Sequence, residues 1–353
     1  MFINKYTFLL RFTTGTKYFL FALFLLLFIP LIGQDYKFAQ YYNAPLNLNP
    51  ALTGKIQSLY RLTANYRMQY FNVQSPSPYT TISGSADFGL FRDKLNKDIF
   101  GIGVVFGNDR QTILRTNKLD VSAAYHKSIG YNKQHYFSAG IQFGFMQRSI
   151  DLNNLYFGSQ FIDDRFDLTK PTLENFNTNK VIKPDLNLGV FWSSSLNKDK
   201  IGVFAGVSAF NLFLPNQSFM YADYERSARF AVYAGSSFQI KQIMMIIPNA
   251  LFAMQAKNID WNVGTNLAFN IAEKKYAFKS AVLFGVFYDG NGLLSTNVGI
   301  QHQGFMAMLG YDASLVKDIN KAVKSVGAME VSIIYTGKPI NTKVYQLLFC
   351  PKF

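Results

Sequence analysis

A two-residue alternation of apolar and polar side chains most constrains this sequence, and it is clearest in the segment Tyr60–Tyr70. The even-numbered positions there are all apolar or aromatic, whereas the odd-numbered positions are all polar and include Arg61 and Arg67. Because successive side chains of a strand point to opposite faces, the segment predicts a strand with one apolar and one polar face. Its length of roughly 10 residues is what a tilted transmembrane strand needs. The aromatic side chains at both ends match the belts of a membrane barrel.

The same alternation recurs in about fourteen segments, an even number as bacterial single-chain outer-membrane barrels require. After Tyr60–Tyr70 these segments begin near Thr80, Phe100, Leu119, Phe137, Leu186, Ile201, Arg229, Ile243, Trp261, Tyr276, Leu294, Phe305 and Met329. No segment after residue 33 has a convincing helical period. We therefore predict an all-β fold, a transmembrane antiparallel outer-membrane β-barrel over residues 58–337. Its outer face is expected to be apolar and its lumen polar and charged.

The spacing between segments gives an independent indication of a barrel. Short turns are expected at Ser128–Gln134, Asn197–Lys200, Ile240–Gln242, Glu273–Lys275 and Gln303–Gly304. Long loops are expected at Asn108–Thr116, Ser149–Pro184, Asn211–Ser227 and Ala313–Val326. Short turns on one rim and long loops on the other are typical of outer-membrane barrels, with the long loops outside the cell. A soluble β-sandwich would not need this rhythm or so many aromatic strand ends.

Composition excludes several classes of protein. Only 16% of the 353 residues are charged, against about 25% in a typical soluble domain, and there are 35 Phe and 21 Tyr. The formal net charge is +14, but Lys and Arg are dispersed rather than clustered, which argues against nucleic-acid binding. The single cysteine, Cys350, excludes an internal disulfide framework and leaves little basis for a cysteine metal site.

The first 33 residues have the layout of a secretory signal peptide. Lys5, Arg11 and Lys17 precede the short apolar run Tyr18–Ile29, and Gly33 stands just before Gln34. The alternative is an uncleaved N-terminal anchor. No cysteine lies at the expected cleavage site, so the sequence does not indicate a lipoprotein.

Catalytic, cofactor and metal sites are not indicated. None of the three histidines, His126, His135 and His302, has a second His or a Cys at metal-ligand spacing. A barrel phospholipase would need a Ser–His pair facing one another on adjacent strands, and the histidines are instead interpreted as turn or interface residues. The glycine-rich runs follow no strand-to-helix switch, so they do not predict phosphate cradles. They fit wall positions where bulky lumen residues press against the backbone.

Three sets of residues are candidates for a functional role. The first is a lumen ion-pair network, with ligand contact as the alternative, formed by Arg61, Arg67, Asp87, Asp120 and Asp185. The second is a partner-binding surface on the long loops, with a lumen-constricting loop as the alternative. Its candidate residues are Leu155, Tyr156, Phe157, Phe161, Asp163, Asp164, Arg165, Phe166, Phe213, Phe219 and Tyr221.

The third set lies in residues 34–57, which are too aromatic for a plain tail. We interpret them as a plug within or beneath the barrel or as a periplasmic docking strip, the alternative being a disordered leader. The expected periplasmic motif consists of Phe38, Gln40, Tyr41, Asn49, Pro50 and Gly54. Residues 338–353 are expected to form a periplasmic C-terminal tail.

Several motifs resemble those of the PorP/SprF membrane proteins of the type IX secretion system, across nearly the whole chain after residue 33. The opening motif FAQYYNAPLNLNPALTG (Phe38–Gly54) and the block QRSIDLNNLYFGSQF (Gln147–Phe161) are the most specific. YRMQY, SPYTTISGSADF, GIGVVFGND and FNLFLPNQSF are similar to further blocks, as is the closing CPKF, where Lys352 stands in place of an expected arginine.

This resemblance implies an outer-membrane protein that helps secrete and non-covalently anchor large surface proteins, such as gliding adhesins, by binding their C-terminal domains. It also implies contacts with periplasmic ring components, and no cofactor or catalytic residues. The alternative is a small-molecule transporter of the fatty-acid type or a porin, with residues 34–57 as its plug. A lumen packed by Arg61, Arg67, Gln69, Asp87 and Asn187 argues against an open pore.

Overall fold

The computed structural model describes residues 35–71, 78–91, 98–130, 134–152, 155–167, 169–174, 176–196, 200–214, 216–220, 226–240, 243–271, 280–316 and 327–337. The expected signal peptide, the C-terminal tail with Cys350, and Tyr221 lie outside these ranges. Within them, no helix has both the length and the apolarity needed to cross a membrane.

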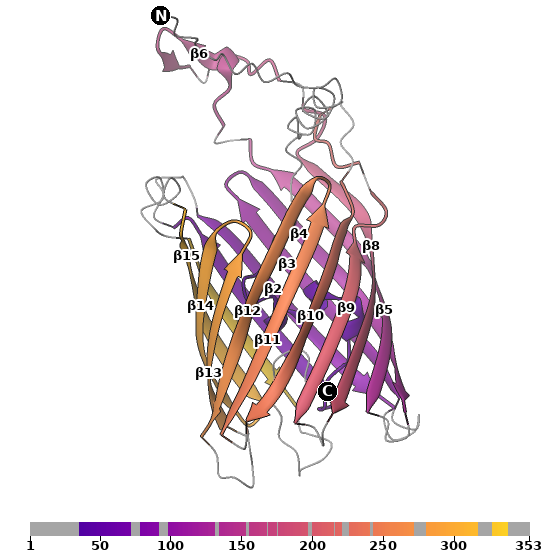
Figure 1. Cartoon of the computed structure of the whole chain (residues 1–353). Coiled ribbons are helices and arrows are strands. Elements are labelled where there is room, and N and C mark those ends of the chain that lie inside the picture. Colours follow the sequence, from indigo (N-terminus) through magenta and orange to yellow (C-terminus); the bar gives the residue numbers. More distant parts are fainter. Residues whose placement is uncertain are drawn as a thin grey trace, which may run out of the picture. The chain divides into compact units, whose positions relative to one another are not determined.

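Fourteen antiparallel strands form one closed barrel, which confirms the predicted fold (Figure 1). They are β1 (Tyr60–Gln69), β2 (Tyr79–Leu90), β3 (Ile99–Gln111), β4 (Leu114–Ile129), β5 (His135–Ile150), β8 (Lys180–Leu196), β9 (Ile201–Phe210), β10 (Arg229–Ile240), β11 (Met244–Gln255), β12 (Asn258–Asn270), β13 (Ser280–Asp289), β14 (Leu293–His302), β15 (Phe305–Ser314) and β16 (Ala328–Thr336). Each strand pairs with its sequence neighbour, and β1 pairs with β16 to close the wall. Closure leaves no unpaired sheet edge.

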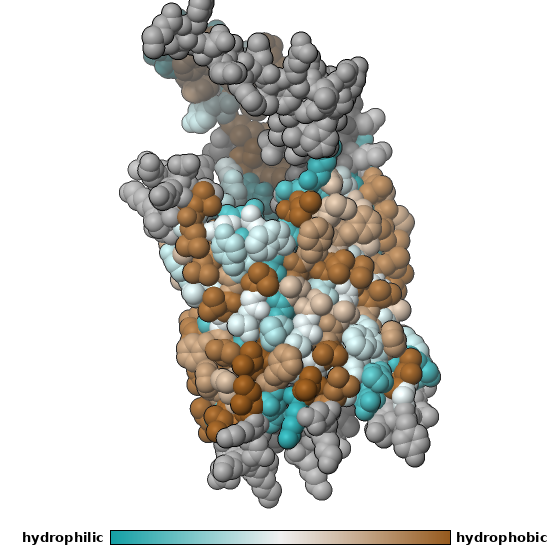
Figure 2. Space-filling view, viewed as in Figure 1, coloured by the Kyte–Doolittle hydropathy of each residue, from teal (hydrophilic) through white to brown (hydrophobic). Residues whose placement is uncertain are grey.

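The predicted alternation is what separates the two faces of the wall. On β1, Arg61 and Arg67 are buried, whereas Leu62 and Tyr66 are exposed on the outer face. Large exposed apolar side chains occur on the outer face of every strand from β1 to β16 in the barrel. Figure 2 shows hydrophobic residues over much of the visible outer wall. This outer face suits a hydrocarbon surrounding, as a transmembrane barrel requires.

The strand connections fall on two rims. The long-loop rim carries connections 70–78, 112–113, 151–179, 211–228, 256–257, 290–292 and 315–327, and the short-turn rim carries 91–98, 130–134, 197–200, 241–243, 271–279 and 303–304. Three of the four long loops predicted are therefore long. The fourth, Asn108–Thr116, is wrong: β3 and β4 continue through it to a two-residue turn. Its polar side chains pair across the strands, as Asn108 does with Asn117, so polarity there marks strand ends and not a loop.

Residues 35–57 lie inside the barrel as a plug containing three short helical turns, η1 (Tyr41–Asn43), α2 (Pro45–Leu48) and η2 (Pro50–Leu52). Their apolar side chains join inward-facing residues of the wall in one buried cluster that includes Tyr42, Leu52, Phe191, Tyr233 and Phe287. The lumen therefore contains an apolar cluster in addition to the polar and charged side chains that were expected there. Inward apolar side chains pack on the plug, which removes them from water.

Wall glycines allow the plug to approach the sheet. A Cβ atom added at Gly140 of β5 would overlap the backbone at Pro50 and Ala51. One added at Gly189 of β8 would overlap the side chain of Asn49. The glycine-rich strands thus provide the close backbone approach that the sequence indicated.

Candidate functional site: the plugged lumen and the long-loop rim

The plug is fastened at the short-turn rim by a buried ion pair. Both Arg61 Nε and Nη2 reach the Asp87 carboxylate, at 3.0 and 2.9 Å. The same two side chains hold the plug: Arg61 donates to the Leu52 carbonyl at 3.1 Å, and Asp87 accepts from the Gly54 amide at 2.7 Å. The pair is therefore a wall contact and a plug anchor at once.

His126 of β4 also contacts the end of the plug near the short-turn rim. Its Nε2 lies 2.8 Å from the Thr53 carbonyl and its Nδ1 lies 2.7 Å from Ser138 Oγ. A second Ser–His contact joins Ser280 Oγ and His302 Nδ1 at 2.8 Å on the outer face. The expectation that no such pair faces across adjacent strands is wrong. At His302, no carboxylate among the described residues is hydrogen-bonded to the imidazole, as a hydrolytic triad would require.

Midway along the lumen, Asn49 bridges the plug and two wall strands. Its Nδ2 donates to the carbonyls of Val190 (3.0 Å) and Val207 (3.1 Å), and its Oδ1 accepts from the Ala51 amide at 2.8 Å. Two plug carbonyls accept hydrogen bonds from side chains of the wall. Gln142 Nε2 donates to the Leu46 carbonyl at 2.9 Å, and Ser208 Oγ donates to the Leu48 carbonyl at 2.7 Å. Buried backbone groups of the plug are thus hydrogen-bonded to inward-facing polar side chains.

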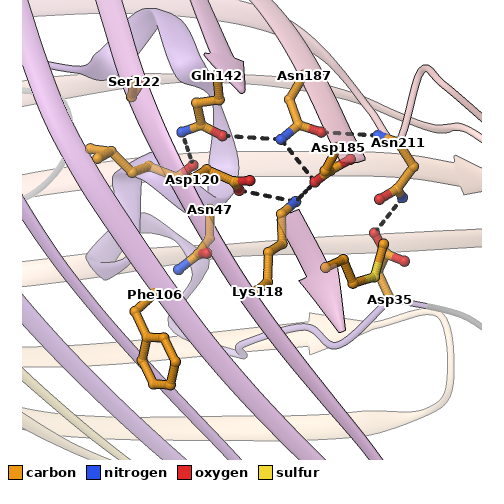
Figure 3. Close-up of polar contacts among 12 residues, drawn as sticks. Asp35, Asn47, Phe106, Lys118, Asp120, Ser122, Gln142, Asp185, Asn187 and Asn211 are labelled. Atoms are coloured by element: carbon orange, nitrogen blue, oxygen red, sulfur yellow. Dashed lines mark hydrogen bonds and ion pairs between the residues drawn. The ribbon is translucent and has the colours of Figure 1, made fainter. Parts of the chain in front are cut away.

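Toward the long-loop rim, polar groups from the wall and the plug form a connected network (Figure 3). Lys118 Nζ lies 2.5 Å from Asp185 and 3.4 Å from Asp120. Asn187 donates to Asp185 at 3.3 Å and to Gln142 at 3.4 Å. The network reaches the plug through Asn211, which donates to Asp35 at 2.8 Å. Of the five predicted lumen residues, Asp120 and Asp185 therefore meet through Lys118, which was not among the predicted residues.

Asp35 attaches the plug close to the long-loop rim. Its carboxylate pairs with Arg226 and accepts from Gln255 Nε2 at 3.0 Å. Arg226 lies in connection 211–228, and Gln255 ends β11. The plug therefore crosses the lumen, from Asp35 at the long-loop rim to Gly54 near the short-turn rim.

Arg67 binds two acids that sequence reasoning missed, Asp312 at 2.6 Å and Glu330 at 2.8 Å. Glu330 also accepts from the amides of Ala39 at 2.8 Å and Gln40 at 2.9 Å. A further cation, Lys37 of the plug, lies 2.7 Å from Asp260 and 3.1 Å from Asp289. Asp312 and Glu330 stand at inward positions of the alternation on their strands, and that signal could have identified them.

A cavity with charged walls lies between the plug and the long-loop rim. Its lining includes the five cations Lys37, Arg67, Lys118, Arg226 and Arg229. Acids line it as well, among them Asp35, Asp120 and Asp260. We call this space the vestibule. No group of three metal-ligating side chains occurs in the part of the chain that the structure describes.

The residues expected to form a periplasmic motif lie inside the barrel. Phe38, Gln40, Tyr41, Asn49, Pro50 and Gly54 are all buried inside the barrel. They therefore cannot present a periplasmic docking surface in this conformation. Their side chains and backbone contact the wall, as Tyr41 does at Asn249.

The candidate loop residues separate into exposed and packed sets. Tyr156, Phe161 and Phe166 are exposed and contact one another, with ring centroids of Tyr156–Phe166 and Phe161–Phe166 5.1 and 5.0 Å apart. The strands β6 (Phe161–Ile162) and β7 (Arg165–Phe166) pair as a hairpin whose turn is Asp163–Asp164, both at positive φ. Those two aspartates therefore form a two-residue hairpin turn.

Four other candidates have their own contacts or partial burial. Phe157 packs on Phe176 at 6.0 Å, and Leu155 is half-buried. Phe219 lies under the Arg148 guanidinium at 5.9 Å. Phe213 is exposed but packs on Phe143 of the outer wall at 6.3 Å, away from the hairpin aromatics.

Comparison with known proteins gives one family and several similar folds. The family model described as type IX secretion system membrane protein PorP/SprF matches residues 31–335. No curated protein matches the chain. Among solved structures, the Pseudomonas putida toluene transporter TodX is 9% identical, with 87% of this chain and 98% of that chain covered and a TM-score of 0.49.

Two further solved structures are similar at the same level. The Ralstonia pickettii toluene transporter TbuX is 10% identical over 83% of this chain and 92% of that chain, with a TM-score of 0.46. The monoaromatic hydrocarbon channel CymD is 12% identical over 87% and 95%, with a TM-score of 0.46.

Proposed function

Because the chain belongs to the PorP/SprF family of type IX secretion system membrane proteins, we propose that it is a plugged barrel that anchors a secreted surface protein non-covalently. Fold and family point to the outer membrane, where the long-loop rim faces outward and the short-turn rim faces the periplasm. The partner is a surface protein such as a gliding adhesin, bound through its C-terminal domain. Residues 1–33 act as a signal peptide removed before assembly.

The exposed aromatic cluster of Tyr156, Phe161 and Phe166 is the observation that supports this proposal most directly. Three large rings lie together on a loop of the long-loop rim, where no described residue covers them. Exposed aromatic groups on a long loop are typical of binding surfaces, and aromatic side chains dominate binding energy there. The hairpin that carries Phe161 and Phe166 also has short strand edges that a partner's sheet can extend.

The plug favours an anchoring function for the barrel rather than a function as a solute channel. Its apolar residues pack into the wall, and its polar groups bond to β2, β4, β5, β8, β9 and β16. A solute path through this lumen would require many of these contacts to break together. We further propose that the short-turn rim and residues 338–353 meet the periplasmic components of the secretion system.

The test is a barrel carrying Tyr156→Ser, Phe161→Ser and Phe166→Ser, produced in cells from which the native gene has been removed. We expect the surface protein to be lost from intact cells and its C-terminal domain to bind the purified barrel at least about tenfold more weakly. The matched control removes three exposed aromatics from the outer wall, Phe137→Leu, Phe143→Leu and Phe252→Leu, and should leave display unchanged.

A planar-bilayer measurement separates the two functions weighed for this chain. The plugged barrel should give no sustained conductance. Steady channel openings, together with normal surface display by the Tyr156, Phe161 and Phe166 variant, would reject anchoring and favour a small-molecule transporter.

A further inference from the structure

A row of cations lies on the outer face of the barrel at one part of the long-loop rim. Arg110 of β3 pairs in register with Arg115 of β4. The row continues through Ser149 of β5 to Lys180 of β8. Side chains paired in register share one face of the sheet, and the three cations are exposed. We call these four residues the basic row.

The positive charges of the basic row have no acidic partners in the wall. In the part of the chain that the structure describes, the side chains of Arg110, Arg115 and Lys180 form neither an ion pair nor a hydrogen bond. Arg110 and Arg115 are directly opposite one another, with Cβ atoms about 5 Å apart in such a pair, and like charges placed in this way destabilise a sheet. An anion bound between the two guanidinium groups would remove that repulsion.

A surface pocket of about 280 Å³ lies at this pair of arginines. Both arginines and Ser149 line it, together with one acid, Asp151, so cations outnumber acids in the lining two to one. Guanidinium N–H groups and a hydroxyl are donors that suit phosphate oxygens. Since pockets that enclose a drug-sized ligand measure about 300–1,000 Å³, this one suits a single charged group of a larger molecule.

Two further rows on the same outer face lie between the basic row and the middle of the barrel. The nearer row consists of amides paired in register, Asn108, Asn117 and Gln147. The next row consists of exposed apolar side chains paired in register, Phe106, Leu119 and Phe145. The basic row is four residues from the apolar row, or roughly 14 Å along the strands. The outer face therefore changes from apolar to amide to cationic toward the rim.

This order of side chains occurs where the strands are long. The strands β4, β5 and β8 have 16, 16 and 17 residues, whereas a tilted strand needs roughly 9–11 to cross a bilayer. The additional residues place the basic row beyond the hydrocarbon, at the level of lipid headgroups. Elsewhere on this rim the outer face ends in apolar side chains, as at Phe230, Met254 and Ile259, which pair in register on β10, β11 and β12.

We propose that the basic row binds the phosphate groups of a phosphorylated glycolipid of the outer leaflet, the chemical class of lipopolysaccharide. The acyl chains lie against Phe106, Leu119 and Phe145, and the amide row meets the sugars, whose hydroxyl groups both donate and accept hydrogen bonds. Basic clusters next to membrane-spanning segments bind anionic headgroups in this way. The apolar row commits the site to a lipid rather than to a free anion. The inference goes beyond the anchoring function and requires only that the long-loop rim faces outward.

The probe is purified lipopolysaccharide, compared with the same preparation after removal of its lipid phosphates and with inorganic phosphate. Each is titrated against the full-length barrel in detergent micelles, and binding is followed by the rise in melting temperature. The phosphorylated lipid should stabilise the wild-type barrel. The double variant Arg110→Gln, Arg115→Gln should bind it at least about tenfold more weakly.

The matched control removes the same charge from two exposed cations of the long-loop rim outside the basic row, Lys170→Gln and Lys257→Gln. It should leave the Kd for the lipid unchanged. Equal Kd values for the arginine variant and this control would overturn the inference. Equal binding of the dephosphorylated lipid, or equal stabilisation by inorganic phosphate at the same concentration, would also overturn it.

The melting temperature without lipid gives a second test. Because the two arginines repel one another when no anion is bound, the double variant should melt at or above the wild-type temperature in lipid-free detergent. A lower melting temperature would assign the arginines to stabilising contacts within the hairpin and reject the lipid site. The anchoring function does not depend on any of these outcomes.

Discussion

Replacing Asn49 by alanine should loosen the plug without opening the barrel wall. The change removes three hydrogen bonds, to the carbonyls of Val190 and Val207 and from the amide of Ala51. Each net hydrogen bond contributes about 1 kcal/mol, so the seated plug should lose about 3 kcal/mol relative to the displaced plug. Since 1.4 kcal/mol corresponds to a tenfold change in an equilibrium, the displaced population should rise about 100-fold.

A buried thiol on the plug measures that population. Ala51 is fully buried, so an Ala51→Cys side chain, on a Cys350→Ser background, should react with a thiol reagent only when the plug leaves its seat. We expect the reaction to be about 100-fold faster with Asn49→Ala. The matched control is Asn47→Ala, which removes the 2.7 Å bond to Ser83 and the 3.4 Å bond from Tyr36 in a less buried place. Equal rates for the two variants would refute the assignment of Asn49 as the central attachment.

Three other changes test separate contacts. Arg67→Met leaves the carboxylates of Asp312 and Glu330 buried without their cation and should destabilise the barrel by about 3–5 kcal/mol in denaturant titrations, with recovery when Asp312→Asn and Glu330→Gln are added. Gly140→Val should prevent seating of η2 while the wall still closes, seen as rapid labelling of Ala51→Cys with an unchanged strand signal in circular dichroism. Burial opposes ionisation of Asp98 in the turn before β3, but hydrogen bonds from Lys127, Ser128 and Tyr125 lower the pKa of its carboxyl below the usual value. Its stabilising effect should therefore be complete above about pH 4 and be lost as the pH falls toward the lowered pKa; Asp98→Asn should remove that part of the acid dependence of the melting temperature.

The barrel could be predicted from the sequence because the two-residue period is a local signal that depends on which face meets hydrocarbon. Leu62 and Tyr66 face outward and Arg61 and Arg67 inward for that reason alone. The period says nothing about where a strand stops once it leaves the membrane. The polar residues at the ends of β3 and β4 therefore predict a loop, although in the structure they extend a hairpin.

Contacts across the lumen could not be predicted, because they depend on which strands face each other after closure. Arg61 and Asp87 are opposite one another on adjacent strands, and the ion pair between them follows from a local register. The partners of Arg67 lie on β16, which comes next to β1 only when the barrel closes, and on β15, one strand further along the wall. Lys118 could not be predicted for the same reason, because it contacts Asp120 on its own strand and Asp185 on β8, two strands away.

The opening motif that carries the family resemblance is explained by packing inside the barrel rather than by contact with a periplasmic partner. Its Asn49, Pro50 and Gly54 lie directly against wall glycines, namely Gly189, Gly140 and Gly101 in turn. Such contacts require a particular side chain on the plug and the absence of one on the wall, so the motif and the glycine-rich strands depend on one another. A motif fixed by packing inside the barrel needs no periplasmic partner to account for it. The partner recognition that we propose is therefore assigned to the rims, and on the long-loop rim the described residues include exposed rings at Tyr156, Phe161 and Phe166.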